Sequence, residues 1–103
     1  MSRTTYILNY SDLMAADRTI EKILREENYD LISENGEKVW KCGHGTWAAI
    51  KYIKVEFMED NMLHLSGWVR SSTVGEMNLD GVIGGLPKKQ VLAVIKRIKT
   101  SVQ

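Results

Sequence analysis

The chain has 103 residues, 14 basic and 13 acidic side chains, a net charge of +1, one Cys and one Pro. This length suits a single domain over 1–103, one Cys cannot form an internal disulfide, and no apolar run reaches the ~18 residues that a membrane-spanning helix needs. The near-zero net charge gives no general attraction to nucleic acid or to anionic lipid.

The N-terminal segment MSRTTYILNY predicts a strand over 4–10 and lacks the apolar stretch of a signal peptide. We therefore expect a cytoplasmic protein. Ser11 stands where the N-cap of a helix belongs, and the helix should run over about 12–27, with Asn28 as its terminating residue. Its apolar face recurs at helical spacing and consists of Leu13, Ala16, Ile20, Ile23 and Leu24.

Two hairpins follow this helix. Asn35-Gly36 predicts a two-residue turn, which places Ile32 opposite Val39 and Leu31 opposite Trp40. The same turn places Glu34 opposite Glu37, which is unfavourable, so a longer loop is the alternative.

The second hairpin joins 50–58 to 62–70. A three-residue loop over 59–61 gives regular alternation on both strands and places Tyr52 opposite Trp68, whereas a two-residue loop would break the alternation. The predicted core face consists of Ile53, Val55, Phe57, Leu63, Leu65 and Val69.

The segment 71–86 is rich in glycine and predicts a long loop, with a short strand or turn near 77–83. Pro87 suits the first turn of a closing helix. The apolar stripe of that helix consists of Val91, Leu92, Val94, Ile95, Ile98 and Val102.

The predicted order of elements is β-α-β-β-β-β-α. This order indicates an α+β fold, a two-layer sandwich of a mostly antiparallel sheet with two helices packed on one face. The order is similar to that of the β-α-β4-α unit of the TATA-binding-protein-like fold, a likeness of element order that carries no function.

Charge is distributed unevenly. Residues 12–37 hold eight acidic and three basic side chains, a net charge of −5, whereas residues 82–103 hold five basic side chains and no acid. We interpret these segments as two solvated helix faces that attract each other when they pack side by side; the alternative is a partner-binding patch.

Aromatic side chains are the most unusual feature of the chain. In the preferred register Tyr52 and Trp68 share the face opposite the predicted core. We place seven residues on or beside this face: Tyr52, Trp68, Trp40, Trp47, Arg70, Met58 and Met62. A sheet face that meets water should be polar, so either another segment covers the rings or they form a binding surface.

The single Cys and the two His residues are the other candidates for chemistry. Cys42, His44 and His64 lack the paired spacing of a zinc motif, so we predict no metal and no cofactor. Cys42 with His44 as its base would need a third, orienting group, which the sequence does not identify, so we predict no catalytic residue.

A Gly-rich stretch before the closing helix forms a possible anion site. It consists of Gly84, Gly85, Lys88 and Lys89, for which solvated lysines are the alternative interpretation.

These observations favour a non-enzymatic binding or protein-interaction module that uses the aromatic sheet face, with a second copy or another protein as its partner. The alternative is a small-ligand binder or small enzyme with a site around Cys42, His44 and the loop over 71–86. Single-stranded nucleic acid is disfavoured because the net charge is close to zero.

Overall fold

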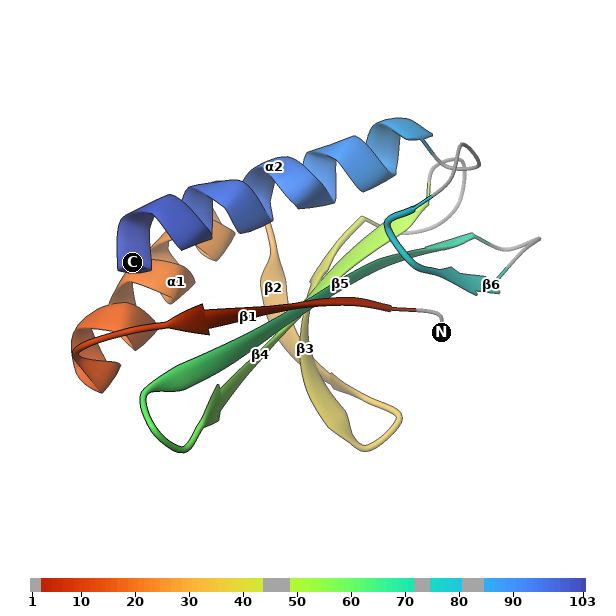
Figure 1. Ribbon diagram of the computed structural model, residues 1–103. Coiled ribbons are helices and arrows are strands. Elements are labelled where there is room, and N and C mark those ends of the chain that lie inside the picture. The colour runs from red at the N-terminus through yellow and green to blue at the C-terminus, as the bar shows by residue number, and fades with distance from the viewer. Residues whose placement is uncertain (1–2, 44–48, 72–74, 81–84) are drawn as a thin grey trace.

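The computed structural model describes residues 3–43, 49–71, 75–80 and 85–103. Its elements are β1 (Thr4–Asn9), α1 (Leu13–Glu26), β2 (Asp30–Glu34), β3 (Glu37–Cys42), β4 (Ile50–Met58), β5 (Met62–Ser71), β6 (Gly75–Met77) and α2 (Gly85–Val102). Both helices lie on the same side of an antiparallel sheet (Figure 1), which confirms the predicted α+β fold. Neither described helix is long and apolar enough to cross a membrane.

The sheet has the strand order β1-β5-β4-β3-β2, and β6 pairs with β5 beyond the end of β1. Both hairpin registers are confirmed, with Ile32 opposite Val39 and Tyr52 opposite Trp68. The tight turn at Asn35 fixes the first of these registers, because its backbone has a φ of 53°.

The sixth strand lies earlier than expected. We predicted a short strand or turn near 77–83, but β6 covers Gly75–Met77, where it pairs with the end of β5. Residues 81–83 lie outside the described part of the chain.

Helix α1 begins one residue later than predicted, because Asp12 and not Ser11 is its N-cap. The Asp12 carboxylate accepts hydrogen bonds from the backbone N–H groups of Met14 and Ala15, at 3.0 and 3.2 Å. The helix therefore buries its face from Ala16 onward, and Leu13 is exposed rather than part of the core.

The end of α1 is as predicted. Asn28 has a φ of 68°, its N–H donates to the carbonyl of Arg25, and the N–H of Tyr29 donates to the carbonyl of Leu24. This pair of bonds is a Schellman motif, which satisfies the last carbonyls of the helix. Tyr29 is buried beside Leu24 in the core, so the turn also starts the path into β2.

The main core lies between the helices and the sheet. It includes Ile20 and Leu24 of α1, Ile53 and Leu65 of the sheet, and a buried stripe of α2. That stripe consists of Val91, Val94, Ile95 and Ile98. The amphipathic pattern of both helices therefore identified the faces that the sheet covers.

Opposite charges meet where the helices pack together. Arg97 of α2 forms ion pairs with Glu26 and with Glu27, the latter at 2.9 Å. The acidic and basic segments of the sequence thus contact each other within one chain at these three residues.

Candidate functional site

The aromatic residues predicted to share one face of the sheet do not all lie on that face. Tyr52 and Trp68 lie on the helix-free face, as expected. Trp40 stands opposite Ile53 and belongs to the core on the helix side, so its predicted placement on the aromatic face is wrong. Side chains opposite each other on paired strands point to the same side of a sheet, and Ile53 points to the helices. Trp47 lies outside the described residues.

Tyr52 and Trp68 are stacked. Their ring centroids are 5.2 Å apart with an interplanar angle of 5°. Only 1% of Tyr52 and 2% of Trp68 is exposed, and the two rings form a second, smaller core cluster with Val39 and Ile50. The rings are therefore covered within the chain itself and stabilise the helix-free face from inside.

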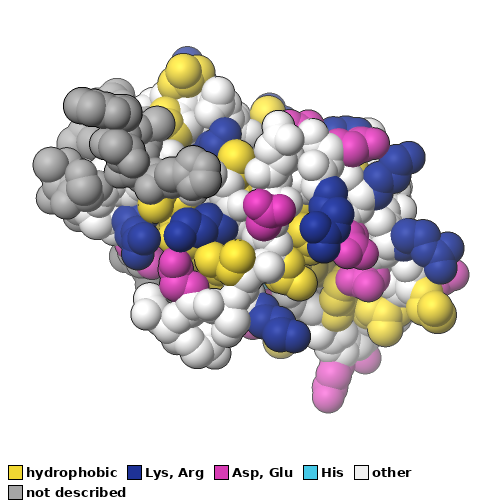
Figure 2. Space-filling view, turned by 180° about the vertical axis from the view of Figure 1, so that it is seen from behind, with side chains coloured by type: hydrophobic (Ala, Val, Ile, Leu, Met, Phe, Trp, Pro, Cys, Tyr) yellow, Lys and Arg dark blue, Asp and Glu magenta, His cyan; other side chains and the backbone are white. Residues whose placement is uncertain are grey.

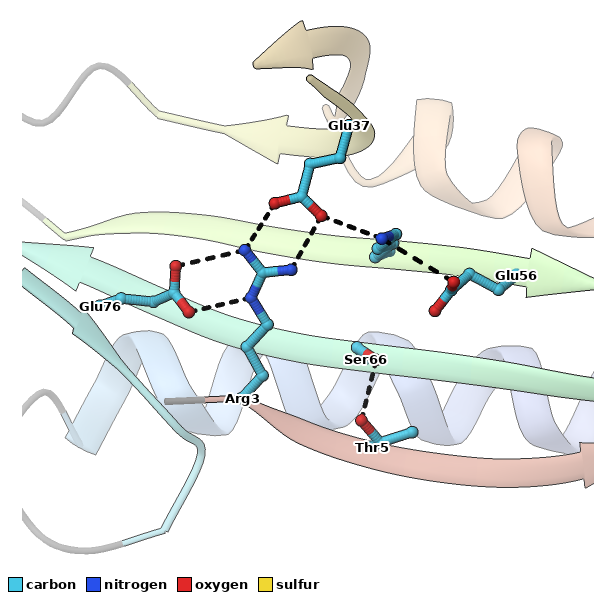
Figure 3. A network of polar contacts seen from close by, with 7 residues as sticks. Arg3, Thr5, Glu37, Glu56, Ser66 and Glu76 are labelled. Atoms are coloured by element: carbon cyan, nitrogen blue, oxygen red, sulfur yellow. Dashed lines mark hydrogen bonds and ion pairs between the residues drawn. The ribbon is translucent and has the colours of Figure 1, made fainter. Parts of the chain in front are cut away.

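Arg3 covers this ring pair. Its guanidinium carbon lies 3.7 Å from the centroid of Trp68, a cation–π distance. The same guanidinium donates to both carboxylate oxygens of Glu37 at 2.9 and 2.7 Å, and to Glu76 at 2.9 Å (Figure 3). Lys54 extends the network, with its amino group 3.0 Å from Glu37. Arg3, the residue before β1, thereby contacts the first residue of β3 and the middle residue of β6.

Two further cations lie over the other ring. The guanidinium of Arg70 is 5.6 Å and the amino group of Lys41 5.8 Å from the centroid of Tyr52. The cavity beneath these charged side chains is about 20 Å³ in volume. A space of this size holds about one water molecule, so in this arrangement the aromatic pair offers no room for a larger ligand.

The charged side chains over the ring pair shift the pKa values of the groups around them. Hydrogen bonds from Arg3 and Lys54 lower the pKa of Glu37 to about 2. Hydrogen bonds to the carboxylates of Glu37 and Glu76 raise the pKa of Arg3 above its ordinary value. Burial, with a contribution from Glu34, raises the pKa of Tyr52 to about 12. The ion pairs on this face are therefore formed throughout the neutral pH range.

Glu37→Gln tests this cover. A carboxyl group with a lower pKa in the folded protein than in the unfolded chain stabilises the fold above about pH 5, and this contribution is lost as the pH falls toward 2. We expect the variant to lose about 1 kcal/mol of unfolding free energy at pH 7 and clearly less near pH 2, where the native carboxyl is half protonated. Urea unfolding at pH 7 and near pH 2 measures this loss, and Glu59→Gln, at an exposed position, is the control. An equal loss of unfolding free energy at the two pH values would contradict the ion pairs of Glu37 with Arg3 and Lys54.

The predicted methionines lie at the far end of the helix-free face. Met58 is exposed and stands opposite half-buried Met62, and Ile7 of neighbouring β1 is also exposed, at 59%. Seen from behind, hydrophobic side chains lie between charged ones of both signs (Figure 2). That view shows no broad surface of a single charge.

An open groove lies on the helix side, between α1 and the sheet. It has a volume of about 270 Å³, and Trp40 is among its buried walls. Exposed Leu31 of edge strand β2 lies at its rim. The lining residues are Asp17, Ile20, Glu21, Leu31, Lys38, Trp40, Val55 and Phe57. We call this the α1–β4 groove.

The groove exists because the two hairpins diverge. Strands β3 and β4 pair over three residue pairs, which join 40–42 with 51–53. Beyond Ile53 the hairpins separate (Figure 1), and within the described chain no strand pairs with the β3-facing edge of 54–58. Backbone hydrogen-bonding groups on that edge are thus left beside an apolar wall.

The other predicted site residues do not come together. The Cys42 thiol is half-buried and lies 4.0 Å from the backbone carbonyl of Glu27. His44 lies outside the described residues, and His64 stands in β5 opposite Glu56. Among the residues that the structure describes, no three His, Cys, Asp or Glu side chains are grouped as metal ligands would be.

The possible anion site is partly described. Lys88 is buried, and its amino group donates to the backbone carbonyl of Asp80, whereas Lys89 is exposed. Gly85 is the first residue of α2, and Gly84 lies outside the described residues. The Lys88 charge is therefore already engaged by the loop before the helix.

Sequence reasoning missed Arg3 and the groove. The predicted pairing of Leu31 with Trp40 was the one signal that pointed toward a groove wall. Arg3 gave no signal, because its partners are 34 and 73 residues away in the sequence.

Comparisons with protein-family models, with curated proteins and with solved structures each found no match to this chain.

Proposed function

We propose that this protein is a non-enzymatic interaction module that binds an extended segment of a partner protein in the α1–β4 groove. The observation that carries the proposal is the β3-facing edge of β4 at residues 54–58, which no strand of the described chain pairs with and which lies beside the apolar wall formed by Trp40, Val55 and Phe57. Apolar contact and a free backbone edge support binding more directly than they support proton transfer or nucleophilic attack.

A strand edge recruits a peptide through main-chain hydrogen bonds, and the pockets beside it select alternate side chains. Every second side chain of a peptide paired with 54–58 would point toward the groove, where Val55 and Phe57 offer apolar contact. The partner segment should therefore carry aliphatic or aromatic residues at alternate positions.

Charged residues at the rim of the groove indicate which charges the partner segment should carry. Asp17 and Glu21 of α1 stand on one side of the groove and Lys38 of β3 on the other. Basic residues on the α1 side of the segment and an acidic residue near Lys38 would meet opposite charges. Such rim charges contribute to partner choice and orientation more than to affinity.

Selection from a display library of random peptides of about twelve residues tests the proposal. Panning against the full chain should enrich extended sequences with alternating apolar residues. Leu31→Lys, which places a charge at the groove rim, should weaken the selected peptides about tenfold in fluorescence anisotropy.

The matched control is Met14→Lys on α1. Met14 is also apolar, is 70% exposed and does not line the groove, so its substitution should leave peptide binding unchanged. Equal loss of binding in both variants, or none in Leu31→Lys, would contradict binding in the groove.

A further inference from the structure

Among the described residues, the outer edge of β1 has no strand paired with it, and the strand carries no charge. Strand β1 ends the order of the sheet and pairs with β5 over all six of its residues, Thr4 to Asn9, without a bulge. Its sequence TTYILN contains no charged residue and no Pro. Within the described chain no strand pairs with its other edge. Natural sheets protect such edges with charges, Pro, bulges or a covering segment, because a free edge pairs with other chains.

The opposite edge of the sheet is protected. Strand β2 has five residues and carries Asp30 and Glu34 at its two ends. Antiparallel pairing of two β2 strands in full register would place these acids of the two copies against each other, which is unfavourable. Self-pairing through β1 brings no charged side chains of the strands together. The charge pattern therefore favours β1 as the edge that meets a second copy.

We propose that two copies of this chain associate through their β1 strands, paired antiparallel, so that one continuous sheet runs through the dimer. Residues opposite each other in such a pair point to the same side of the sheet. A register centred on Ile7 pairs residues that point to the same side of the sheet in each copy. It places Ile7 opposite Ile7 of the second copy. It also places Thr5 opposite Asn9, and Tyr6 opposite Leu8.

This register buries the exposed apolar side chain of the strand. Ile7 is 59% exposed in the single chain and would lie at the centre of the pairing. The contact does not rest on the proposed peptide groove, because β1 and β2 are opposite edges of the sheet and the groove lies beside β2, β3 and β4.

Sedimentation velocity from about 1 µM to about 1 mM tests the dimer. The wild type should shift from monomer to dimer, and Ile7→Lys should raise the dissociation constant at least about tenfold. Leu31→Lys, an apolar-to-charged change on the other edge strand, should leave it unchanged. A monomer throughout this range, or a dimer that Leu31→Lys dissociates and Ile7→Lys does not, would overturn the proposal.

Cysteine cross-linking tests the register, because opposed residues of paired strands have Cα separations that a disulfide can span. In a Cys42→Ser background, Ile7→Cys should oxidise to a covalent dimer. Thr5→Cys and Asn9→Cys should each remain monomeric alone and cross-link when mixed. Homodimers of Asn9→Cys with none of Ile7→Cys would overturn the register.

Discussion

Replacement of Trp68 by Ala is expected to lower the free energy of unfolding by about 3–5 kcal/mol. The side chain is 2% exposed, stacks on Tyr52 at 5.2 Å and lies under the guanidinium of Arg3 at 3.7 Å. Its removal leaves a cavity and also separates Arg3 from the ring that supports it. The helix-free face would then lose both its small core and the cover above it.

Urea unfolding followed by circular dichroism at pH 7 measures this loss. Met58→Ala is the control, because Met58 lies on the same face of the sheet but is exposed at the hairpin end. We expect it to cost less than about 1 kcal/mol. Similar effects of the two substitutions would show that the stacked rings do not hold this face together.

Gly67→Ala is the second substitution with a large expected effect, because α2 packs directly on the β5 backbone at this residue. A Cβ atom at Gly67 would lie 2.9 Å from the Cδ1 atom of Ile95 and 2.9 Å from a Cγ atom of Val91. Overpacking of this kind costs about 1–3 kcal/mol. Thermal unfolding should therefore show a lower melting temperature for the variant.

A double variant separates crowding from other causes. Ile95→Val removes the Cδ1 atom in question and costs about 0.5–1.5 kcal/mol alone. Combined with Gly67→Ala it should cost less than the sum of the two single changes, since it removes one of the atoms that crowd the new methyl group. Gly85→Ala, where a Cβ meets nothing within 4 Å, should be neutral. Strict additivity would contradict close packing of α2 on β5.

The hairpins were predictable because tight turns and strict alternation fix their registers. The Asn35-Gly36 turn and the three-residue loop after Met58 each determine every pair in their hairpin. The pairing of β3 with β4 has no such signal, because the connection between Cys42 and Ile50 is longer than a tight turn. The face of the sheet that Trp40 occupies therefore could not be read from alternation.

The position of Arg3 over the aromatic pair could not be predicted from the sequence either. Arg3 precedes β1 and contacts Glu37 and Glu76, which stand on strands that the fold, not the local sequence, brings beside it. Arg3 nevertheless matters for Trp68, because its guanidinium lies over the ring and makes this part of the face a buried cluster instead of an exposed binding surface. Composition and periodicity described which residues would share a face but not which distant side chain would close it.

Mapping of backbone amide signals by NMR during titration with a selected peptide tests the proposed binding site most directly. The largest shift changes should fall on 54–58 and on Trp40, and amide exchange should slow in 54–58 when the peptide is bound, because new main-chain hydrogen bonds form there. Shifts concentrated around Arg3 and Trp68, or binding without slower exchange in β4, would contradict strand addition in the α1–β4 groove.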